Sequence, residues 1–278
     1  MNVIRAETLG LCFGVRDALT IAARVERPAE VTIHGDLVHN EAVLVQLDAR
    51  GFHRSTEQNR GSLPETKRVL ITAHGISDAA RRRFESGGKD LIDTTCPLVR
   101  RAHRAAQTLA VEGYHVLVIG RPGHVEVQGI VEDLSVYDMI AGTDDVQRYA
   151  SDKLGVICQT TTPPRTVEPI LAAIRERNPN AEVRLVDTIC QPTRDRQQAV
   201  EKLLVTVDAM VVVGGSRSNN TRELVALCRE QGVPAYHVQS AAELVASWFE
   251  NCANVGLTAG TSTLDETIEE VHAALLRL

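Results

Sequence analysis

The chain has 278 residues, of which 44% are hydrophobic and 24% charged, and its formal net charge is −6. These values are typical of an ordinary globular protein with about two domains or several small modules. They exclude a chain that is basic overall, so no general attraction draws it to nucleic acid or to an anionic membrane. An anionic ligand would need a local site.

The first residues, from Met1 to Glu7, lack the basic segment and following apolar segment of a secretory signal. No uninterrupted apolar run reaches the roughly 18 to 20 residues that cross a membrane. We therefore expect a cytoplasmic protein whose six cysteines stay mostly reduced and form no disulfide framework.

Three stretches of the sequence place a cysteine just before a predicted helix, and they resemble one another. Cys96 and Cys190 both stand in the frame Asp-Thr-x-Cys, and Cys12 follows a glycine turn. The three cysteines are separated by close to a third of the chain. We predict three pseudo-equivalent α/β modules, with approximate bounds 1–95, 96–189 and 190–278.

Short apolar runs alternate with amphipathic helical stretches along the whole chain. This order is typical of mostly parallel sheets that are covered by helices. The predicted buried strands are 31–34, 68–73, 115–120, 154–158, 209–214 and 254–258. Among the predicted helices are 165–177, 222–229 and 266–276.

The predicted strand ends are rich in histidine, serine, threonine, asparagine and glycine, and they lack lysine. In open α/β sheets ligands bind at these ends. Hydroxyls, side-chain amides and backbone N–H groups can all donate to phosphate oxygens, and protonated histidines add positive charge. For residues 218–221, helix capping is as good an interpretation as ligand binding. Six such strand ends together favour a binding site for a small anion.

The six cysteines fall into two classes. Three lie in apolar contexts and are expected to be small buried core residues, namely Cys158, Cys228 and Cys252. The other three occupy turns and can hold an iron–sulfur cluster that leaves one iron without a protein ligand. Structural zinc would favour paired Cys-x-x-Cys ligands, which the sequence lacks. Spacing alone leaves the cluster and three unrelated core thiols equally open.

Different short motifs are distributed along nearly the whole chain. They are Gly10-Leu11-Cys12-Phe13-Gly14-Val15, Leu37-Val38-His39-Asn40, Ala73-His74-Gly75, Asp93-Thr94-Thr95-Cys96-Pro97-Leu98-Val99, Gly123-His124-Val125-Glu126, Gln159-Thr160-Thr161, Cys190-Gln191-Pro192-Thr193-Arg194-Asp195-Arg196-Gln197, Ser218-Asn219-Asn220 and Gly260-Thr261-Ser262. In this order the set resembles the LytB (IspH) family of 4-hydroxy-3-methylbut-2-enyl diphosphate reductases.

The resemblance implies a trefoil of three α/β modules around a central [4Fe–4S] cluster, held by Cys12, Cys96 and Cys190, with the substrate's allylic hydroxyl at the open iron. It implies proton delivery by Glu126 together with Thr160 and His124. The diphosphate would be bound by residues from several strand ends, namely His39, His74, His124, Thr160, Ser218, Asn219, Asn220 and Ser262.

The implied reaction is the reductive removal of that hydroxyl, which gives isopentenyl and dimethylallyl diphosphate in the last step of the methylerythritol phosphate route. A ferredoxin or flavodoxin-type donor would supply the electrons. The chain departs from the family pattern at two positions. Asn219 stands where a second serine is frequent, and Val125 stands where proline is frequent.

Other interpretations remain open at this point. Three-cysteine cluster enzymes of the quinolinate synthase or diphthamide-forming type would not need the three histidines together with Glu126. A cluster-bearing sensor would need an output surface such as a basic helix-turn-helix, and none is visible in the sequence. A zinc-stabilised structural protein is the remaining alternative.

Overall fold

The computed structural model describes residues 1–57 and 60–278. Within these residues the strands form three four-stranded sheets, and the strand pairs are all parallel. The chain divides into two compact units. Unit 1 comprises Met1–Arg16, His39–Val43 and Gln191–Leu278, and unit 2 comprises Asp17–Val38 and Leu44–Cys190.

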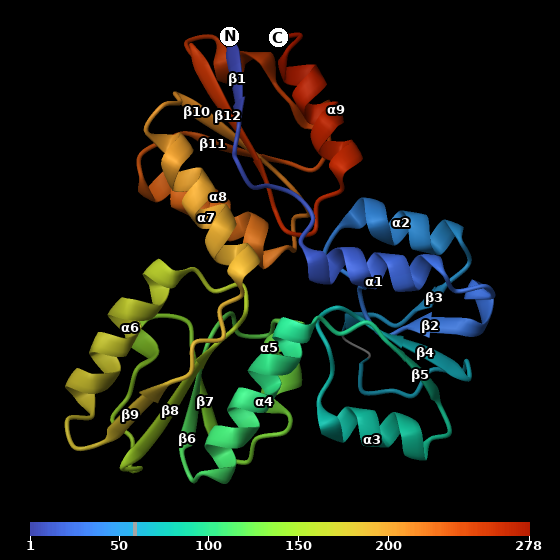
Figure 1. Ribbon diagram of the computed structural model, residues 1–278, viewed down its shortest axis with the longest axis vertical. Helices are drawn as coiled ribbons and strands as arrows, with labels where there is room; N and C mark the ends of the chain where they lie inside the picture. Colours follow the sequence, from blue (N-terminus) through green and yellow to red (C-terminus); the bar gives the residue numbers. More distant parts are fainter. Residues whose placement is uncertain (58–59) are drawn as a thin grey trace. The chain divides into compact units, whose positions relative to one another are not determined.

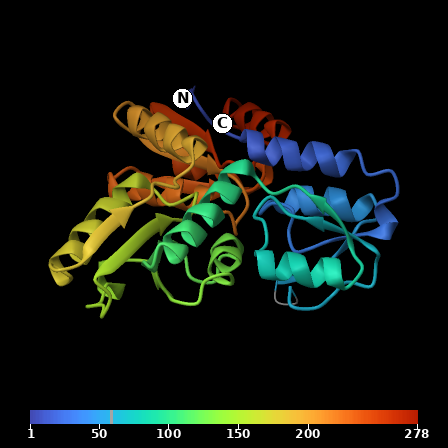
Figure 2. The same ribbon diagram turned by 60° about the horizontal axis from the view of Figure 1, so that its bottom comes forward.

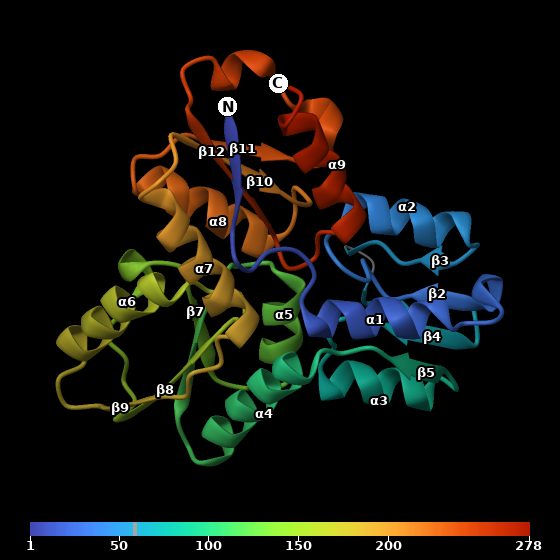
Figure 3. The same ribbon diagram turned by 45° about the horizontal axis from the view of Figure 1, so that its top comes forward.

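Unit 1 contains one sheet, with the strand order β1-β12-β10-β11 (Figure 1). Helices α7 and α8 pack on one face of this sheet and α9 packs on the other. Figure 3 shows α7 and α8 side by side. The bounds are β1 Asn2–Arg5, α7 Gln191–Leu204, β10 Ala209–Val213, α8 Asn219–Glu230, β11 Ala235–Val238, β12 Asn254–Ala259 and α9 Asp265–Leu275, with 3-10 turns η4 Ala241–Glu243 and η5 Ala246–Phe249.

The first sheet of unit 2 has the order β3-β2-β4-β5. Phe84 of α3 is fully buried and packs against Val69 and Ile71 of β4, so α3 covers one face. The bounds are η1 Pro28–Glu30, β2 Val31–Ile33, β3 His53–Arg54, β4 Arg68–Ile71, α3 Asp78–Ser86 and β5 Asp90–Asp93. Two helices begin in unit 1 and continue in unit 2, namely α1 Phe13–Ala23 and α2 Glu41–Ala49.

The second sheet of unit 2 has the order β7-β6-β8-β9. Helices α4 and α5 cover one face and α6 covers the other, as Figure 2 shows for α4 and α6. The bounds are α4 Pro97–Val111, β6 His115–Ile119, α5 Val125–Val131, β7 Tyr137–Ile140, η3 Thr143–Asp145, β8 Lys153–Cys158, α6 Pro164–Arg177 and β9 Glu182–Leu185.

The expected class, α/β modules with parallel sheets, is confirmed, and each of the six predicted strands is present within one or two residues. Interior strands such as β10 (sequence AMVVV) are buried along their whole length, because helices cover both faces of a parallel sheet. The sequence interpretation missed β1, β3, β5 (DLID), β7, β9 (EVRL) and β11. These strands lie at sheet edges, where polar side chains reach solvent.

Two further expectations need correction. Helix α8 begins at Asn219, so Asn219, Asn220 and Thr221 lie inside the helix rather than before it, and only Ser218 is its N-cap. Cys252 is partly exposed, whereas Cys158 and Cys228 are fully buried as expected. The three module boundaries stay predictions. No helix in the described part of the chain is long and apolar enough to cross a membrane.

Candidate active site

Two cysteine turns of unit 2 are built in the same way. The Asp93 carboxylate accepts the backbone N–H two residues later at 2.9 Å, and the Asp187 carboxylate does the same at 3.1 Å. An aspartate that accepts a hydrogen bond from the backbone two residues on forms an Asx turn. In both cases the turn leads directly to the cysteine, Cys96 or Cys190, and a helix begins at the next residue.

The threonine of each Asp-Thr-x-Cys frame ties the turn to the neighbouring strand. Thr94 Oγ1 donates to the carbonyl of Ile71, the last residue of β4, at 2.6 Å. Thr188 Oγ1 donates to the carbonyl of Cys158, the last residue of β8, and accepts the Cys158 N–H at 2.8 Å. The frame seen in the sequence is therefore a structural device that fixes a cysteine beside a strand end.

Backbone hydrogen bonds complete both turns. The Cys96 N–H donates to the Ala73 carbonyl at 3.1 Å, and the Cys190 N–H donates to the Thr160 carbonyl at 2.9 Å. Burial alone would raise the pKa of the Asp93 carboxyl, but hydrogen bonds from Thr95 and the neighbouring Arg81 guanidinium lower it to about 2. The carboxylate that holds the turn is therefore ionised at neutral pH.

The turn of Cys12 in unit 1 uses different contacts. The Cys12 N–H donates to the Thr261 carbonyl at 3.0 Å. Two residues earlier, the Gly10 carbonyl accepts Nε and Nη2 of buried Arg196 at 3.1 and 2.5 Å. Gly10 has φ +74°, a conformation that glycine adopts without strain, and a Cβ there would lie 2.6 Å from Ile268. A remote arginine thus replaces the local Asx turn.

Glu126 is buried in the first turn of α5, and its carboxylate is held by one residue. The Thr160 N–H donates to Oε1 at 2.7 Å and Thr160 Oγ1 donates to Oε2 at 2.9 Å. Burial raises the pKa of Glu126 to about 7, although both bonds from Thr160 work in the opposite direction. A carboxyl group with this pKa carries a proton for much of the time near neutral pH.

Two of the predicted histidines lie together in unit 2. The rings of His74 and His124 are 5.7 Å apart between centroids and nearly perpendicular. His124 is the N-cap of α5, where its Nδ1 accepts the Glu126 N–H at 3.2 Å. That bond leaves Nε2 as the nitrogen that can donate to a ligand. Unit 2 therefore brings His74, His124, Glu126 and Thr160 together with the turns of two cysteines.

The other predicted anion ligands lie in unit 1. Ser262 Oγ donates to the His39 carbonyl at 3.2 Å, and the Asn40 amide donates to the Ser262 carbonyl at 2.7 Å. Asn220 Oδ1 accepts the Thr261 N–H at 3.0 Å. Asn220 is only 1% exposed, and its Nδ2 has no partner among the described residues. A buried amide donor without an acceptor is costly, so it indicates a place where a ligand oxygen binds.

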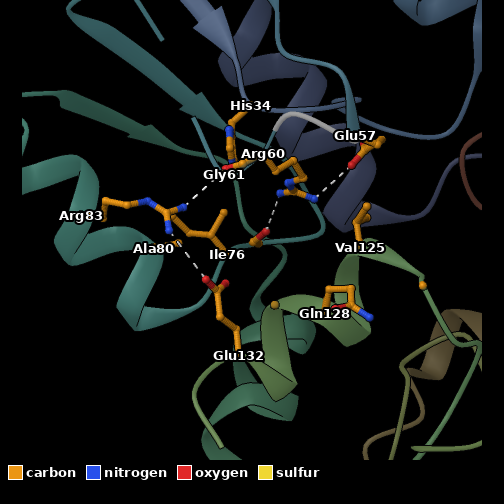
Figure 4. A pocket seen from close by; sticks show the side chains of 13 residues that line it. His34, Glu57, Arg60, Gly61, Ile76, Ala80, Arg83, Val125, Gln128 and Glu132 are labelled. Atoms are coloured by element: carbon orange, nitrogen blue, oxygen red, sulfur yellow. Dashed lines mark hydrogen bonds and ion pairs between the residues drawn. The ribbon is translucent and has the colours of Figure 1, made fainter. Parts of the chain in front are cut away.

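A cavity of about 230 Å³ in unit 2 is lined partly by sequence neighbours of His74 and His124 (Figure 4). Gly75, Gly123 and Val125, which flank these histidines in sequence, line it. Its two arginines are paired, Arg60 with Glu57 at 3.3 Å and Arg83 with Glu132 at 3.9 Å. Burial, together with both guanidiniums, lowers the pKa of its His34 to about 3. This cavity therefore offers no unbalanced positive charge to a diphosphate.

Comparison with known proteins decides the family. The family model described as LytB protein matches residues 3–276. This chain belongs to the LytB family. A reductase of Methylibium petroleiphilum, named 4-hydroxy-3-methylbut-2-enyl diphosphate reductase, is 37% identical over all of this chain and 85% of its own length. A protein of the same name from Anaeromyxobacter sp. (strain K) is 36% identical over the full length of both.

Solved structures agree with the sequence relatives. The E-1-hydroxy-2-methyl-but-2-enyl-4-diphosphate reductase from Plasmodium falciparum superposes with a TM-score of 0.91 at 27% identity, covering all of this chain and 88% of that one. A structure of (E)-4-hydroxy-3-methyl-but-2-enyl diphosphate reductase, described as the terminal enzyme of the non-mevalonate pathway, gives 0.68 at 31% identity over the whole of both chains. The resemblance that the motifs indicated is confirmed.

The cysteine frames and the LytB motifs also contain residues whose roles the sequence did not reveal. Asp93 and Asp187 belong to the shared frame, but only the hydrogen bonds show that they shape the turns. Arg196 lies in a LytB motif far from Cys12 in sequence, yet it holds the Gly10 carbonyl. The repeated Asp-Thr-x-Cys frame was the signal for the first two, whereas no signal in the sequence linked Arg196 to Gly10.

Proposed function

We propose that this chain reduces (E)-4-hydroxy-3-methylbut-2-enyl diphosphate to isopentenyl and dimethylallyl diphosphate, the last step of the methylerythritol phosphate route to isoprenoids. Each turnover takes up two electrons and two protons. The allylic C–O bond breaks, a C–H bond forms, and the hydroxyl leaves as water. Membership of the LytB family and the names of the full-length relatives support this reaction.

The observation that carries the mechanism is the state of Glu126. Hydroxide is a poor leaving group, so the reaction needs an acid that still holds its proton at neutral pH. Glu126 meets this requirement because burial raises its pKa to about 7. A positioned general acid of this kind typically accelerates a reaction by roughly 10² to 10⁴-fold. We assign Glu126 as the proton donor to the departing hydroxyl.

Thr160 positions this acid. Its N–H and its hydroxyl bind different oxygens of the Glu126 carboxylate, so together they fix the plane of the group. The same bonds limit how far burial raises the pKa. His124, whose Nδ1 accepts the Glu126 N–H, couples the start of α5 to the proposed diphosphate ligands. We therefore assign Thr160 and His124 to proton delivery alongside Glu126.

The diphosphate, in this proposal, is bound by the residues that the family resemblance implies, namely His39, His74, His124, Thr160, Ser218, Asn219, Asn220 and Ser262. The unpaired Nδ2 of buried Asn220 supports this assignment most strongly. The hydroxyl of Ser218 already accepts the Thr221 N–H at 3.3 Å as the N-cap of α8, and its hydrogen stays available to a phosphate oxygen. Asn219, at the first position of α8, places a further amide in the same turn.

Cys12, Cys96 and Cys190 would hold a [4Fe–4S] cluster. Their side chains are partly exposed, unlike Cys158 and Cys228, and each stands directly before a helix. The positive end of a helix favours a thiolate, the form that ligates iron. When bound, such a cluster would relay electrons and offer a Lewis-acid iron to the substrate oxygen. The donor set therefore fits the cluster that the family resemblance implies.

The protein itself holds no source of two electrons, so an external donor is required. We propose a ferredoxin or flavodoxin-type protein for this role. We further propose that the chain works in the cytoplasm, where thiols stay reduced, since none of its six cysteines forms a disulfide.

The test is anaerobic reconstitution with iron and sulfide, followed by an assay of reduced methyl viologen oxidation with the allylic diphosphate. The proposal predicts a brown protein that oxidises about two viologen equivalents per substrate, and none without substrate. A brown protein that ignores this substrate would contradict the proposed reaction. A colourless protein would contradict the cluster.

A further inference from the structure

The N-terminal half of α4 carries an unusual concentration of positive charge. Arg100, Arg101 and Arg104 all lie in its first two turns, and its first turn contains no acidic residue. Cations near a helix N-terminus oppose the helix macrodipole, so this arrangement does not serve the stability of the helix. It also stands out in a chain whose formal net charge is −6.

These arginines lie away from the buried face of α4. The buried residues of the helix are Val99, Ala102, Ala106 and Leu109, which form one stripe that packs on the sheet. On a helical wheel Arg104 falls opposite this stripe, and both Arg101 and Arg104 are exposed. Arg104 makes no hydrogen bond or ion pair within the described part of the chain. Its charge is therefore available to a partner.

A neighbouring arginine from α3 extends this surface. Arg81 and Arg100 share the Asp93 carboxylate, so one negative charge faces two guanidiniums. A cavity of about 140 Å³ opens between α3 and α4, and Arg81, Arg100 and Arg104 line it. Among the described residues that line it, Asp78 is the acidic one. We call Arg81, Arg100, Arg101 and Arg104 the basic patch.

The basic patch lies close to one proposed cluster ligand. Cys96 is the N-cap of α4, and Thr95 beside it lines the same cavity. Arg104 follows Cys96 by eight positions, which corresponds to about 12 Å along a helix that rises 1.5 Å per residue. A protein that covers the basic patch would therefore bring its own surface within about that distance of the Cys96 turn.

We propose that the basic patch docks the acidic face of a small electron-carrier protein of ferredoxin type. This inference rests on the proposed function, which requires two electrons from outside. Two reduced carriers dock in turn, each is oxidised by one electron, and the substrate takes up both electrons with two protons. Opposite charges steer such encounters and raise the association rate, and the effect falls with ionic strength.

The test uses the full-length reconstituted protein and an acidic plant-type ferredoxin. Calorimetry at low salt measures the dissociation constant for oxidised ferredoxin. This constant should rise roughly five- to tenfold in Arg104→Glu. The constant of Arg104→Gln should lie between that of Arg104→Glu and that of the wild type. Turnover driven by ferredoxin should lose a similar factor in kcat/KM for ferredoxin. Turnover driven by methyl viologen should not change, because that small dye needs no docking surface.

The matched control is Arg148→Glu, which makes the same charge change at an exposed loop position outside the basic patch. It should leave the ferredoxin dissociation constant unchanged. Equal effects of Arg148→Glu and Arg104→Glu would overturn the proposal, since only net charge would then matter. Wild-type protein that accepts viologen electrons but does not bind ferredoxin would also overturn it. If the wild-type protein showed no viologen-driven turnover, the proposed function would be contradicted. The calorimetric dissociation constants would still test ferredoxin docking independently.

Discussion

The turns of Cys96 and Cys190 differ in construction from the turn of Cys12. The first two are closed by an aspartate and a threonine within four residues of the cysteine. The third is held by Arg196, which comes from helix α7. The same task, presenting a thiol at the start of a helix, is thus solved twice by local contacts and once by a distant partner.

The largest effect is expected from the cysteines themselves, which should behave alike in spite of their different turns. Cys12→Ser, Cys96→Ser and Cys190→Ser should each lose more than half of the iron and sulfide after reconstitution and nearly all activity. Cys228→Ser, a fully buried core position, serves as the comparison and should keep its iron. Unchanged iron content in any of the first three would remove that residue from the ligand set.

The distant support of Cys12 should be the next most sensitive feature. Arg196→Met removes charged hydrogen bonds to the Gly10 carbonyl at a site only 4% exposed, so the free energy of unfolding should fall by about 2–4 kcal/mol. Denaturant titration measures this. Lys202→Met on the same helix removes an exposed ion pair with Glu7 and should cost less than about 1 kcal/mol. Equal losses would show that Arg196 has no special role.

The two local turns provide a sharper comparison, because both aspartates accept the same backbone N–H bond while Asp93 also pairs with Arg81 and Arg100. Asp93→Asn and Asp187→Asn should each lower the free energy of unfolding by about 1–2 kcal/mol at pH 7. The folded-state pKa of Asp93 is depressed from 3.8 to about 2, so its contribution is present above 3.8 and is lost as the pH falls toward 2. A stability difference between wild type and Asp93→Asn that persists at pH 2 would refute this account.

The smallest effect is expected from the threonines. Thr94→Val and Thr188→Val each remove a hydroxyl that bonds to a strand-end carbonyl and should cost about 1 kcal/mol. Thr188 also accepts a backbone N–H, so its variant should be the less stable of the two. Thermal unfolding of both variants checks the order, and the reverse order would show that the bond from the Cys158 N–H to Thr188 adds no stability.

The sequence predicted much of this molecule for identifiable reasons. Interior strands such as β10 were recognised because residues buried on both faces form continuous apolar runs. The edge strands were missed because their apolar residues form no continuous run; in β5 and β9, for example, charged residues flank or interrupt them. The frame of Cys96 and Cys190 was visible because its parts are adjacent in the chain, whereas the pairing of Arg196 with Gly10 spans 186 residues and leaves no local pattern.

In the candidate site, too, some features were visible in the sequence and others became visible only in the folded chain. The motifs indicated which residue types belong to it, but nothing in the sequence indicated that Glu126 should keep its proton. That property arises from burial, which only the folded chain supplies, and from the opposing bonds of Thr160. Asn220 was expected as a ligand, but its unpaired buried Nδ2 became apparent only in the fold.

The pH dependence of kcat/KM with the allylic diphosphate and reduced viologen tests the central claim most directly. If Glu126 is the proton donor, wild-type kcat/KM should fall about tenfold per pH unit above about 7, where the carboxyl loses its proton. Glu126→Gln should keep its iron but lose roughly 10² to 10⁴-fold in rate, without this fall. A fully active Glu126→Gln variant with unchanged pH dependence would contradict the account.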